Sequence, residues 1–315
     1  MAVIEVKNLK KYFSTPRGVL HAVDDVTLSI EKGKTLGVVG ESGCGKSTLG
    51  RTIIHLLDKT EGKIFLNGED VSDVKGAELK AAREKMQIIF QDPYSSLDPR
   101  MTVEDTIREP LMVSKRYKRR EIDDITRELM DFVGIDDRLR MAYPHELDGG
   151  RRQRVGIARA LALNPDFVVC DEPVSALDVS IQAQVLNLLK KLQQQKGLAY
   201  MFITHDLSVV KHISDDICVM YLGQVVELCP SRKLFKKPMH PYTRALLSAI
   251  PSINIHNRMQ PEILQGEITS PINPKPGCRF AARCKYATEA CHQMQKMQEV
   301  EPGHFVTCCR VQDLN

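Results

Sequence analysis

The sequence predicts an α/β fold built around a buried parallel sheet, and three observations predict it. A glycine-rich segment, residues 40–47, lies between an apolar run typical of a buried strand and a run typical of a helix start. Two more strands are expected at 166–170, where four apolar residues follow Asp166, and at 199–203, which is apolar throughout. Polar residues follow both, as expected of strands covered on both faces. The 315 residues are enough for one large α/β domain with an appendage.

The first 39 residues predict an antiparallel entry sheet. Short strands are expected over residues 2–6, 19–23 and 26–30, with a turn at residues 15–18. Phe13 follows a basic pair and is able either to present its ring to an adenine or to pack in the core. The residues themselves do not decide between these two roles.

Residues 40–47 satisfy the pattern of a loop that wraps a nucleotide's phosphates. Glycines let successive backbone N–H groups turn toward one centre, and the following helix start adds roughly half a positive charge there. Lys46 would neutralise the β and γ phosphates, and the hydroxyl of Ser47 would ligate magnesium. We therefore predict an ATP site whose loop consists of Gly40, Glu41, Ser42, Gly43, Cys44, Gly45, Lys46, Ser47 and Thr48.

The middle of the chain alternates between sheet and helix. A strand over 62–68 ends in an Asn-Gly turn, a helix is expected over 76–85, and a buried strand over 86–90 leads to Gln91. Gln91 therefore lies at the carboxyl end of a strand, where α/β sheets bind ligands. Residues 95–150 contain helical periodicity over 103–111 and 118–133 without a convincing strand. We interpret this segment as an inserted helical subdomain.

Charged side chains follow the later predicted strands. The apolar run at 166–170 delivers Asp171 and Glu172, and an aspartate for magnesium beside a glutamate that orients water suits phosphoanhydride hydrolysis. Asp178 precedes a helix over 180–193. His205 follows the strand at 199–203 and is suited either to hydrogen-bond a γ-phosphate or to a structural role. Upstream, Asp148 is a suitable N-cap for a helix that begins with two glycines.

Composition narrows the class of protein. The chain has 44 basic and 40 acidic residues, a net charge of +4, which does not suggest binding to nucleic acid. No run of about 18 uncharged apolar residues occurs, and the N-terminus lacks the apolar core of a secretion signal. We expect a cytosolic chain that reaches a membrane only through partners.

Five of the nine cysteines crowd the last 40 residues: Cys278, Cys284, Cys291, Cys308 and Cys309. Disulfides are uncommon in a reducing cytosol, so ligation of a metal or cluster is the favoured explanation. The spacings lack the two-residue-separated pairs of the usual zinc sites, whereas four thiolates suit iron and sulfur. Zinc and free thiols remain alternatives.

Taken in order, these motifs resemble the nucleotide-binding subunit of an ABC transporter, and the resemblance covers essentially the whole chain. It implies a P-loop NTPase (RecA-like) core with an antiparallel β subdomain over residues 1–250, and a small cysteine-rich extension over 251–315. By resemblance, residues 40–47 are the Walker A loop, Gln91 the Q-loop, 147–151 the signature and Asp171-Glu172 the end of Walker B. Further residues implied in ATP binding or catalysis are Phe13, which would stack on adenine, Lys46, Asp148, Gly149, Gly150, Arg151, Asp178 of the D-loop, and the switch residue His205. Magnesium would be held by Ser47, Gln91 and Asp171.

The C-terminal quarter is similar to a narrower group, the oligopeptide and dipeptide importer ATPases. Residues 237–247 contain a His-Pro-Tyr segment, and the cysteine-rich tail also matches this group. The resemblance implies a [4Fe-4S] cluster on Cys278, Cys284, Cys291 and Cys308, with Cys309 as an alternative to Cys308. It also implies ATP hydrolysis that drives peptide import from the cytoplasmic face of the membrane, with a second ATPase subunit, two permease subunits and an extracytoplasmic binding protein. A nickel chelate or an oligosaccharide is an alternative cargo, and a soluble ABC protein without a transporter is an alternative class.

The signature departs from the usual Leu-Ser-Gly-Gly-Gln, because residues 147–151 read Leu-Asp-Gly-Gly-Arg. An ionised Asp148 would meet the partner's γ-phosphate with like charge, and two unit charges ~4 Å apart repel by about 4 kcal/mol at an effective dielectric near 20. Arg151 is able to compensate by pairing with Asp148 or by reaching the phosphate. Alternatively, Asp148 only caps its helix. If this repulsion is not compensated, we expect a heterodimer in which one ATP is hydrolysed and the other is retained with little hydrolysis.

Overall fold

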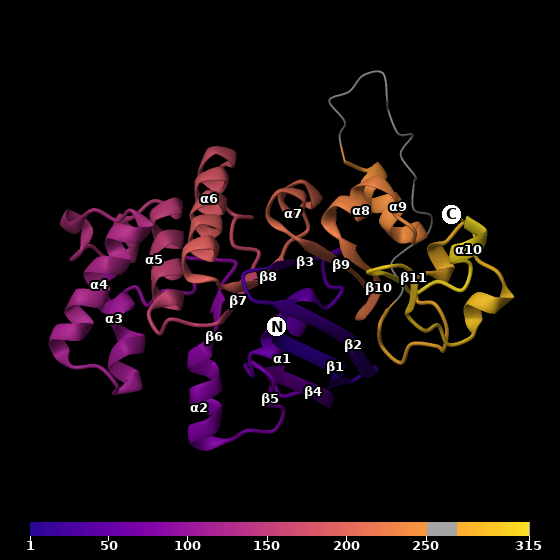
Figure 1. Ribbon diagram of the computed structural model, residues 1–315, viewed down its shortest axis with the longest axis horizontal. Helices are drawn as coiled ribbons and strands as arrows, with labels where there is room; N and C mark the ends of the chain where they lie inside the picture. The colour runs from indigo at the N-terminus through magenta and orange to yellow at the C-terminus, as the bar shows by residue number, and fades with distance from the viewer. Residues whose placement is uncertain (251–269, 315) are drawn as a thin grey trace. The chain divides into compact units, whose positions relative to one another are not determined.

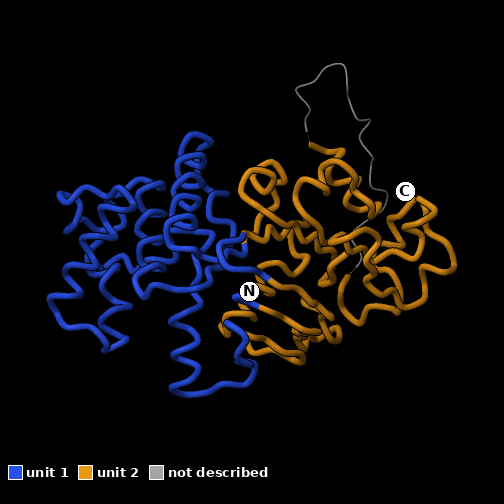
Figure 2. The backbone as a smooth tube through the Cα atoms, viewed as in Figure 1, with its two compact units in different colours: residues 1–4, 30–34, 66–201 blue, residues 5–29, 35–65, 202–315 orange. Residues whose placement is uncertain are grey.

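The computed structural model describes residues 1–250 and 270–314, which form two compact units (Figure 2). Unit 1 contains residues 1–4, 30–34 and 66–201, and unit 2 contains residues 5–29, 35–65 and the described part of 202–315. The domain boundary expected after residue 250 stays a prediction, because the structure does not describe residues 251–269.

Most of the antiparallel sheet belongs to unit 2, and the strands with most of their residues in this unit have the order β2-β1-β4. These strands are β1 (Ala2–Thr15), β2 (Gly18–Glu31) and β4 (Glu61–Leu66). The prediction of separate strands at 19–23 and 26–30 is wrong, because both belong to β2. Asp25 bends that strand in the left-handed region, with φ 57°, and accepts a 2.8 Å hydrogen bond from Asn8 Nδ2. The sequence therefore shows two strand-like runs on either side of Asp25, although the strand itself continues through this residue.

The glycine-rich loop follows a strand of a second sheet, whose strands within unit 2 have the order β11-β12-β10-β9-β3. The strands are β3 (Thr35–Val39), β9 (Asp216–Tyr221), β10 (Gln224–Pro230), β11 (Gln298–Glu301) and β12 (His304–Val306). β3 is parallel to β9 and buried at all five residues, whereas β10 is antiparallel to both β9 and β12. The C-terminal strands therefore extend the sheet from which the glycine-rich loop emerges.

Aromatic side chains join the extension to this sheet. Tyr221 on β9 meets Tyr242 and Phe280 edge-on, with ring centroids 4.7 and 5.3 Å apart. Phe280 is 2% exposed, so part of the tail is core of unit 2. The helical segments of this unit are α1 (Lys46–Ile53), α7 (Leu207–Ile213), α8 (Ser231–Lys236), α9 (Pro241–Ser248), α10 (Val311–Leu314), η3 (Ala281–Arg283) and η4 (Glu289–His292).

Unit 1 combines two parallel strands with a group of helices (Figure 1). β6 (Met86–Ile89) pairs with β7 (Phe167–Asp171), and β8 (Ala199–Ile203) straddles the division between the units. Helices α3 (Val103–Ser114), α4 (Arg119–Val133) and α5 (Gly149–Leu161) contact one another. The remaining elements are β5 (Glu69–Asp70), α2 (Gly76–Lys85), η1 (Asp137–Leu139), η2 (Pro144–Glu146) and α6 (Val179–Lys196). The predicted insertion of helices is thus present within 95–150.

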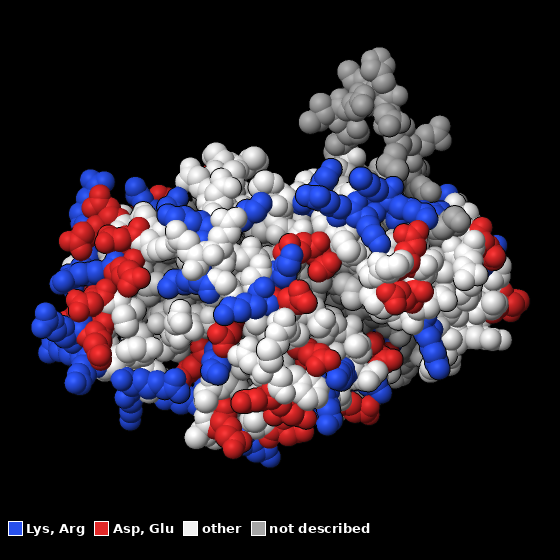
Figure 3. Space-filling view, in the orientation of Figure 1, with Lys and Arg blue, Asp and Glu red and all other residues white. Residues whose placement is uncertain are grey.

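The surface of unit 1 is charged but not of one sign. Lys and Arg side chains are intermixed with Asp and Glu over α3 and α4 on the face drawn in Figure 3. In residues 1–250 and 270–314, none of the helices combines the length and the apolarity that a membrane span requires.

Candidate ATP site and cysteine cavity

The glycine-rich loop connects β3 to α1 in unit 2, as its sequence predicts. Gly40 and Gly45 have φ values of 152° and 105°, a region that side chains rarely adopt. A Cβ at Gly40 would clash with the carbonyl oxygen of Met220, and a Cβ at Gly45 with that of Ala22. These two glycines are therefore required both for the turn and for close packing of the loop on unit 2.

Lys46 begins α1 and folds its side chain over the loop. Its Nζ donates hydrogen bonds to the carbonyl oxygens of Gly40 and Glu41, at 2.8 and 2.9 Å, and the residue is only 5% exposed. The ammonium group thus lies across the loop at the N-terminus of a helix, where both the charge and the backbone dipole favour an anion. This geometry suits binding of a polyphosphate.

In unit 1, two predicted catalytic residues are brought together. Gln91 Nε2 donates a 3.1 Å hydrogen bond to Glu172 Oε2. Glu172 has a positive φ of 48°, unusual for a residue with a side chain, and it directly follows the fully buried Asp171 at the end of β7. The carboxyl ends of β6 and β7 therefore hold an amide and two carboxylates, as the sequence predicts.

Asp148, an altered residue of the signature, caps a helix in this structure. Asp148 is the N-cap of α5, and its Oδ1 accepts a 2.7 Å hydrogen bond from the backbone N–H of Arg151. Its Oδ2 lies 3.5 Å from Arg151 Nε, with the two side chains 54% and 48% exposed. Gly150 has no room for a side chain, since a Cβ would press on Ile181. Capping and pairing with Arg151, two alternatives that the sequence left open, occur together.

The other predicted residues occupy the ends of elements. Asp178 is the N-cap residue of α6 in unit 1. In unit 2, His205 lies between β8 and α7, and Lys11 Nζ lies 4.7 Å from the centroid of the half-buried Phe13 ring. Phe13, residues 40–48 and His205 thus belong to unit 2, and the other predicted residues for ATP and magnesium belong to unit 1.

All five C-terminal cysteines line one small cavity in unit 2. Cys278 N donates to the carbonyl oxygen of Cys291 at 2.8 Å, and the sulfurs of Cys291 and Cys309 are 3.8 Å apart. Burial, together with the neighbouring thiols, raises the pKa of Cys278 to about 12. Cys291 is buried, Cys278, Cys284 and Cys308 are half-buried, and Cys309 is exposed. Thiols that line one cavity are the type of donor that binds a metal cluster, whose positive charge would favour loss of the protons.

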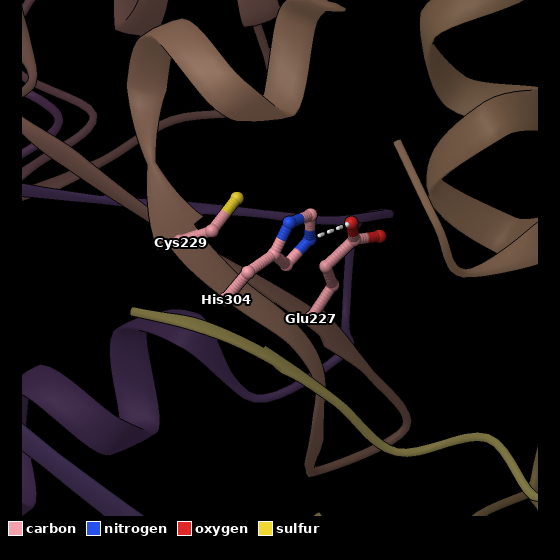
Figure 4. Close-up of side chains that lie close together, drawn as sticks. All are labelled: Glu227, Cys229 and His304. Carbon is pink, nitrogen blue, oxygen red and sulfur yellow. Dashed lines mark hydrogen bonds and ion pairs between the residues drawn. The ribbon is translucent and has the colours of Figure 1, made fainter. Parts of the chain in front are cut away.

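A second group of polar side chains was missed by sequence reasoning. Glu227 on β10 is fully buried and its Oε1 lies 2.7 Å from His304 Nε2 on β12. Figure 4 shows the His304 ring between this carboxylate and the sulfur of Cys229. The backbone N–H groups of Met239 and His240 also donate to Glu227, at 2.8 and 2.9 Å. The carboxylate oxygens are thus occupied by protein donors, so the group connects strands rather than presenting a free metal site.

The pKa of Glu227 reflects the same contacts. Burial alone would raise the pKa of the carboxyl group. Hydrogen bonds from His304 and the two backbone N–H groups outweigh burial and lower the pKa below its ordinary value. Glu227 is therefore held as a buried carboxylate.

Sequence reasoning also missed the two arginines between Cys278 and Cys284. Arg283 donates to the carboxylate of Glu41 in the glycine-rich loop, and Arg279 donates to Asp24 on β2. No local pattern could have indicated these partners, because 242 and 255 residues separate them along the chain.

Strand, glycine-rich loop and helix define a nucleotide-binding protein of the P-loop class, and the strand-end carboxylates suit an ATPase. Comparison with known proteins identifies the family within this class. Residues 23–175 match the family described as ABC transporter, and residues 226–291 match the C-terminal region of oligopeptide/dipeptide transporters.

The chain is 48% identical to the oligopeptide transport ATP-binding protein AppF and 50% identical to OppF, both of Bacillus subtilis. Each alignment covers 97% of this chain and 96% of the relative. The solved dimeric ATP-binding cassette MJ0796 with ADP and Pi superposes with a TM-score of 0.66, at 30% identity, over 73% of this chain and 99% of its own. CbiO1 from Clostridium perfringens, part of an ABC transporter complex, gives 0.67 at 26% identity, over 75% of this chain and 91% of its own.

The chain therefore belongs to the ABC transporter family, among its oligopeptide transport ATP-binding proteins, and it is an ATPase. Its fold is that of the ABC ATPase cassette, so the expected α/β core with an antiparallel subdomain and inserted helices is confirmed.

Proposed function

We propose that this chain hydrolyses ATP to energise an importer of di- or oligopeptides across the cytoplasmic membrane. The observation that carries the proposal is the presence, in one chain, of the ATPase cassette and the transporter C-terminal region, with nearly full-length relatives named for oligopeptide transport. The partners would be two membrane-embedded permease subunits, a second ATPase subunit and an extracytoplasmic binding protein. The chain would lie at the cytoplasmic face, attached through the permeases.

The proposed roles follow the geometry within each unit. In unit 2, the amides of residues 40–48 and the Lys46 ammonium would bind the phosphates, Ser47 would ligate Mg²⁺ and Phe13 would stack on adenine. His205 contacts the γ-phosphate. In unit 1, Asp171 and Gln91 are the residues proposed to ligate Mg²⁺, and Glu172 would act as the general base for the attacking water. Mg²⁺ supplies Lewis-acid stabilisation of the phosphate oxygens.

The signature would act on the ATP of a partner subunit, together with Asp178 of the D-loop. Residues 148–151 form the N-terminus of α5, where the backbone N–H groups of the first turn and the helix dipole favour an anion. The Asp148 carboxylate opposes phosphate charge there, and Arg151 offsets only part of this, because ion pairs between half-exposed side chains contribute about 0–1 kcal/mol. A heterodimer follows, in which the partner supplies an ordinary signature and the two ATPs turn over unequally.

The cysteine cavity would hold a [4Fe-4S] cluster on Cys278, Cys284, Cys291 and Cys308, with Cys309 as the alternative fourth ligand. All five thiols face the same cavity. When bound, the cluster would cross-link the segment at 278–291 to the segment at 308–309. This clip would stabilise a tail of short elements.

Reconstitution tests the function directly. The chain is co-expressed with the neighbouring permease, ATPase and binding-protein genes, purified and placed in proteoliposomes. We expect ATP-dependent uptake of short peptides and stimulation of phosphate release by loaded binding protein. Parallel assays with a nickel chelate and an oligosaccharide identify another cargo, and absence of any membrane complex would leave the soluble ATPase as the better description.

A further inference from the structure

Arg283 links the cysteine-rich segment to the phosphate-binding loop. It is the last residue of η3, directly before Cys284. Its Nη1 lies 2.8 and 3.1 Å from the two carboxylate oxygens of Glu41, and 3.4 Å from the hydroxyl of Tyr221. The Arg283 side chain is 8% exposed and that of Glu41 22% exposed, so solvent screens this ion pair less than a surface pair.

Glu41 is held on its backbone as well. Its N–H donates a 2.9 Å hydrogen bond to the hydroxyl of Tyr242, on the His-Pro-Tyr helix α9. Its carbonyl oxygen accepts the 2.9 Å hydrogen bond from Lys46 Nζ. A shift of Glu41 therefore moves one of the two carbonyls that position the Lys46 ammonium.

Arg279 makes a parallel connection from the same segment. Its side chain is 6% exposed, and it donates to Asp24 and to the carbonyl oxygen of Leu222. Gly223 directly follows Leu222, and its N–H donates a 2.8 Å hydrogen bond to the carbonyl oxygen of Cys44 in the phosphate-binding loop. The segment thus reaches this loop by two routes.

The backbone between Cys278 and Cys284 is too short and too tightly bonded to decouple these arginines from the thiols. Ala281 N donates to the carbonyl oxygen of Cys278 at 3.0 Å, and Cys284 N donates to that of Ala281 at 3.2 Å. Both cysteines line the cavity. A displacement of Cys278 or Cys284 would therefore shift the short backbone segment that carries Arg279 and Arg283.

We propose that Arg283 is a positioning residue of the ATP site, which transmits the state of the cysteine cavity to the phosphate-binding loop through Glu41. The inference rests on the proposed ATP site, not on the identity of the metal. Its proposed role is to fix Glu41, the loop residue whose carbonyl oxygen accepts a hydrogen bond from Lys46. The alternative is that the ion pair only stabilises the fold.

A double-mutant cycle on the full-length chain separates these two roles, with ATP affinity measured by titration of a fluorescent ATP analogue. Arg283→Gln should weaken binding about tenfold, the scale of a charge-assisted hydrogen bond. Glu41→Gln should act similarly, and the double variant should be no worse than either alone. Arg283→Lys should recover part of the affinity. The matched control is Arg232→Gln, an exposed arginine on α8, which should bind as the wild type does.

The proposed transmission from the cysteine cavity to the phosphate-binding loop is tested by Cys284→Ala, made both in the wild-type chain and in Arg283→Gln. It should weaken ATP binding in the wild type and have no further effect in Arg283→Gln. Unchanged affinity of folded Arg283→Gln, additive effects in the cycle, or an equal effect of Cys284→Ala in both backgrounds would overturn the proposal. Thermal melts identify variants that fail to fold, and Arg283→Lys then replaces Arg283→Gln in the cycle. A wild-type chain that does not bind ATP would instead refute the proposed function.

Discussion

The side-chain amide of Gln91 donates a hydrogen bond to the carboxylate of Glu172, with 3.1 Å between Nε2 and Oε2. The two residues follow the paired strands β6 and β7, so the sheet itself brings them together. One amide and one carboxylate at adjacent strand ends are suited to orient a water molecule and accept its proton.

Replacing Glu172 by glutamine should abolish hydrolysis while sparing nucleotide binding. The amide keeps the shape of the side chain but cannot act as a base, so the rate should fall at least about a hundredfold. Phosphate release and retention of labelled ATP are measured on the same preparation. Glu69→Gln, an exposed change in unit 1, is the control and should leave both unchanged. Hydrolysis by Glu172→Gln near the wild-type rate would exclude Glu172 as the base.

Replacing Asp148 by serine should raise ATP turnover of the assembled transporter. Serine keeps an oxygen that can cap α5, so the change isolates the carboxylate charge. Arg151→Gln is the opposite test, since it leaves that charge unpaired and should lower turnover. Single-turnover assays that follow ATP in each site show whether the two sites differ. Equal hydrolysis at both sites in the wild type would contradict the proposed asymmetry.

Protein purified without oxygen should show the broad visible absorbance of an iron–sulfur cluster and should contain iron. Cys278→Ser should remove both signals, because it takes away a thiolate that lines the cavity. Cys308→Ser and Cys309→Ser form a matched pair, and the variant that loses iron identifies the fourth ligand. Colourless wild-type protein without iron after anaerobic reconstitution would refute the cluster.

Glu227→Gln should destabilise the chain at neutral pH. Glutamine keeps the shape of the side chain but removes the charge that strengthens its hydrogen bonds from His304 and two backbone N–H groups, and a hydrogen bond to a charged group contributes about 1.5–3 kcal/mol. The pKa of Glu227 is lowered in the fold, so its stabilisation is present above the ordinary pKa of 4.5 and is lost as the pH falls through the folded value. Thermal melts should therefore show a smaller penalty for the variant in acid than at pH 7.

The control for this prediction is Glu301→Gln, whose partner Lys237 is 2.7 Å away but whose side chain is 37% exposed. It should change the melting temperature little, since an exposed pair is screened by solvent. Equal destabilisation by the two variants would show that burial of Glu227 does not determine its contribution.

Gly45→Ala should prevent ATP binding, whereas Gly43→Ala should only weaken it. Both glycines have positive φ, but a Cβ at Gly45 would clash with the Ala22 carbonyl, and at Gly43 it would meet no atom within 4 Å. Backbone strain at Gly43 alone costs on the order of 1 kcal/mol. Titration of both variants with ATP distinguishes packing from strain, and equal binding by both would contradict this explanation.

Local chemistry explains which elements could be predicted from the sequence. Helix α2 begins and ends at the expected residues, Asp148 caps α5, and the Asn67-Gly68 pair forms a turn with two positive φ values. Each depends on a few neighbouring residues. The continuous strand β2 was not foreseen, because the kink at Asp25 is stabilised by Asn8 on another strand.

The ATP site was predictable for the same reason, since phosphate binding by a loop needs a contiguous pattern of glycines followed by Lys46 and Ser47. The contacts of Arg283 with Glu41 and of His304 with Glu227 were not, because tertiary packing alone brings these residues together. The shared cavity of the cysteines is likewise a product of folding. The roles of Phe13 and His205 stay predictions.

Pairing of β12 with β10 has a consequence for truncated forms of the chain. Removing the residues after 250 would leave the backbone N–H and C=O groups of β10 without the partners that β12 supplies, and would uncover the carboxylate of Glu227. An open strand edge of this kind readily recruits a strand from another molecule. A shortened cassette should therefore aggregate at concentrations at which the whole chain stays dispersed.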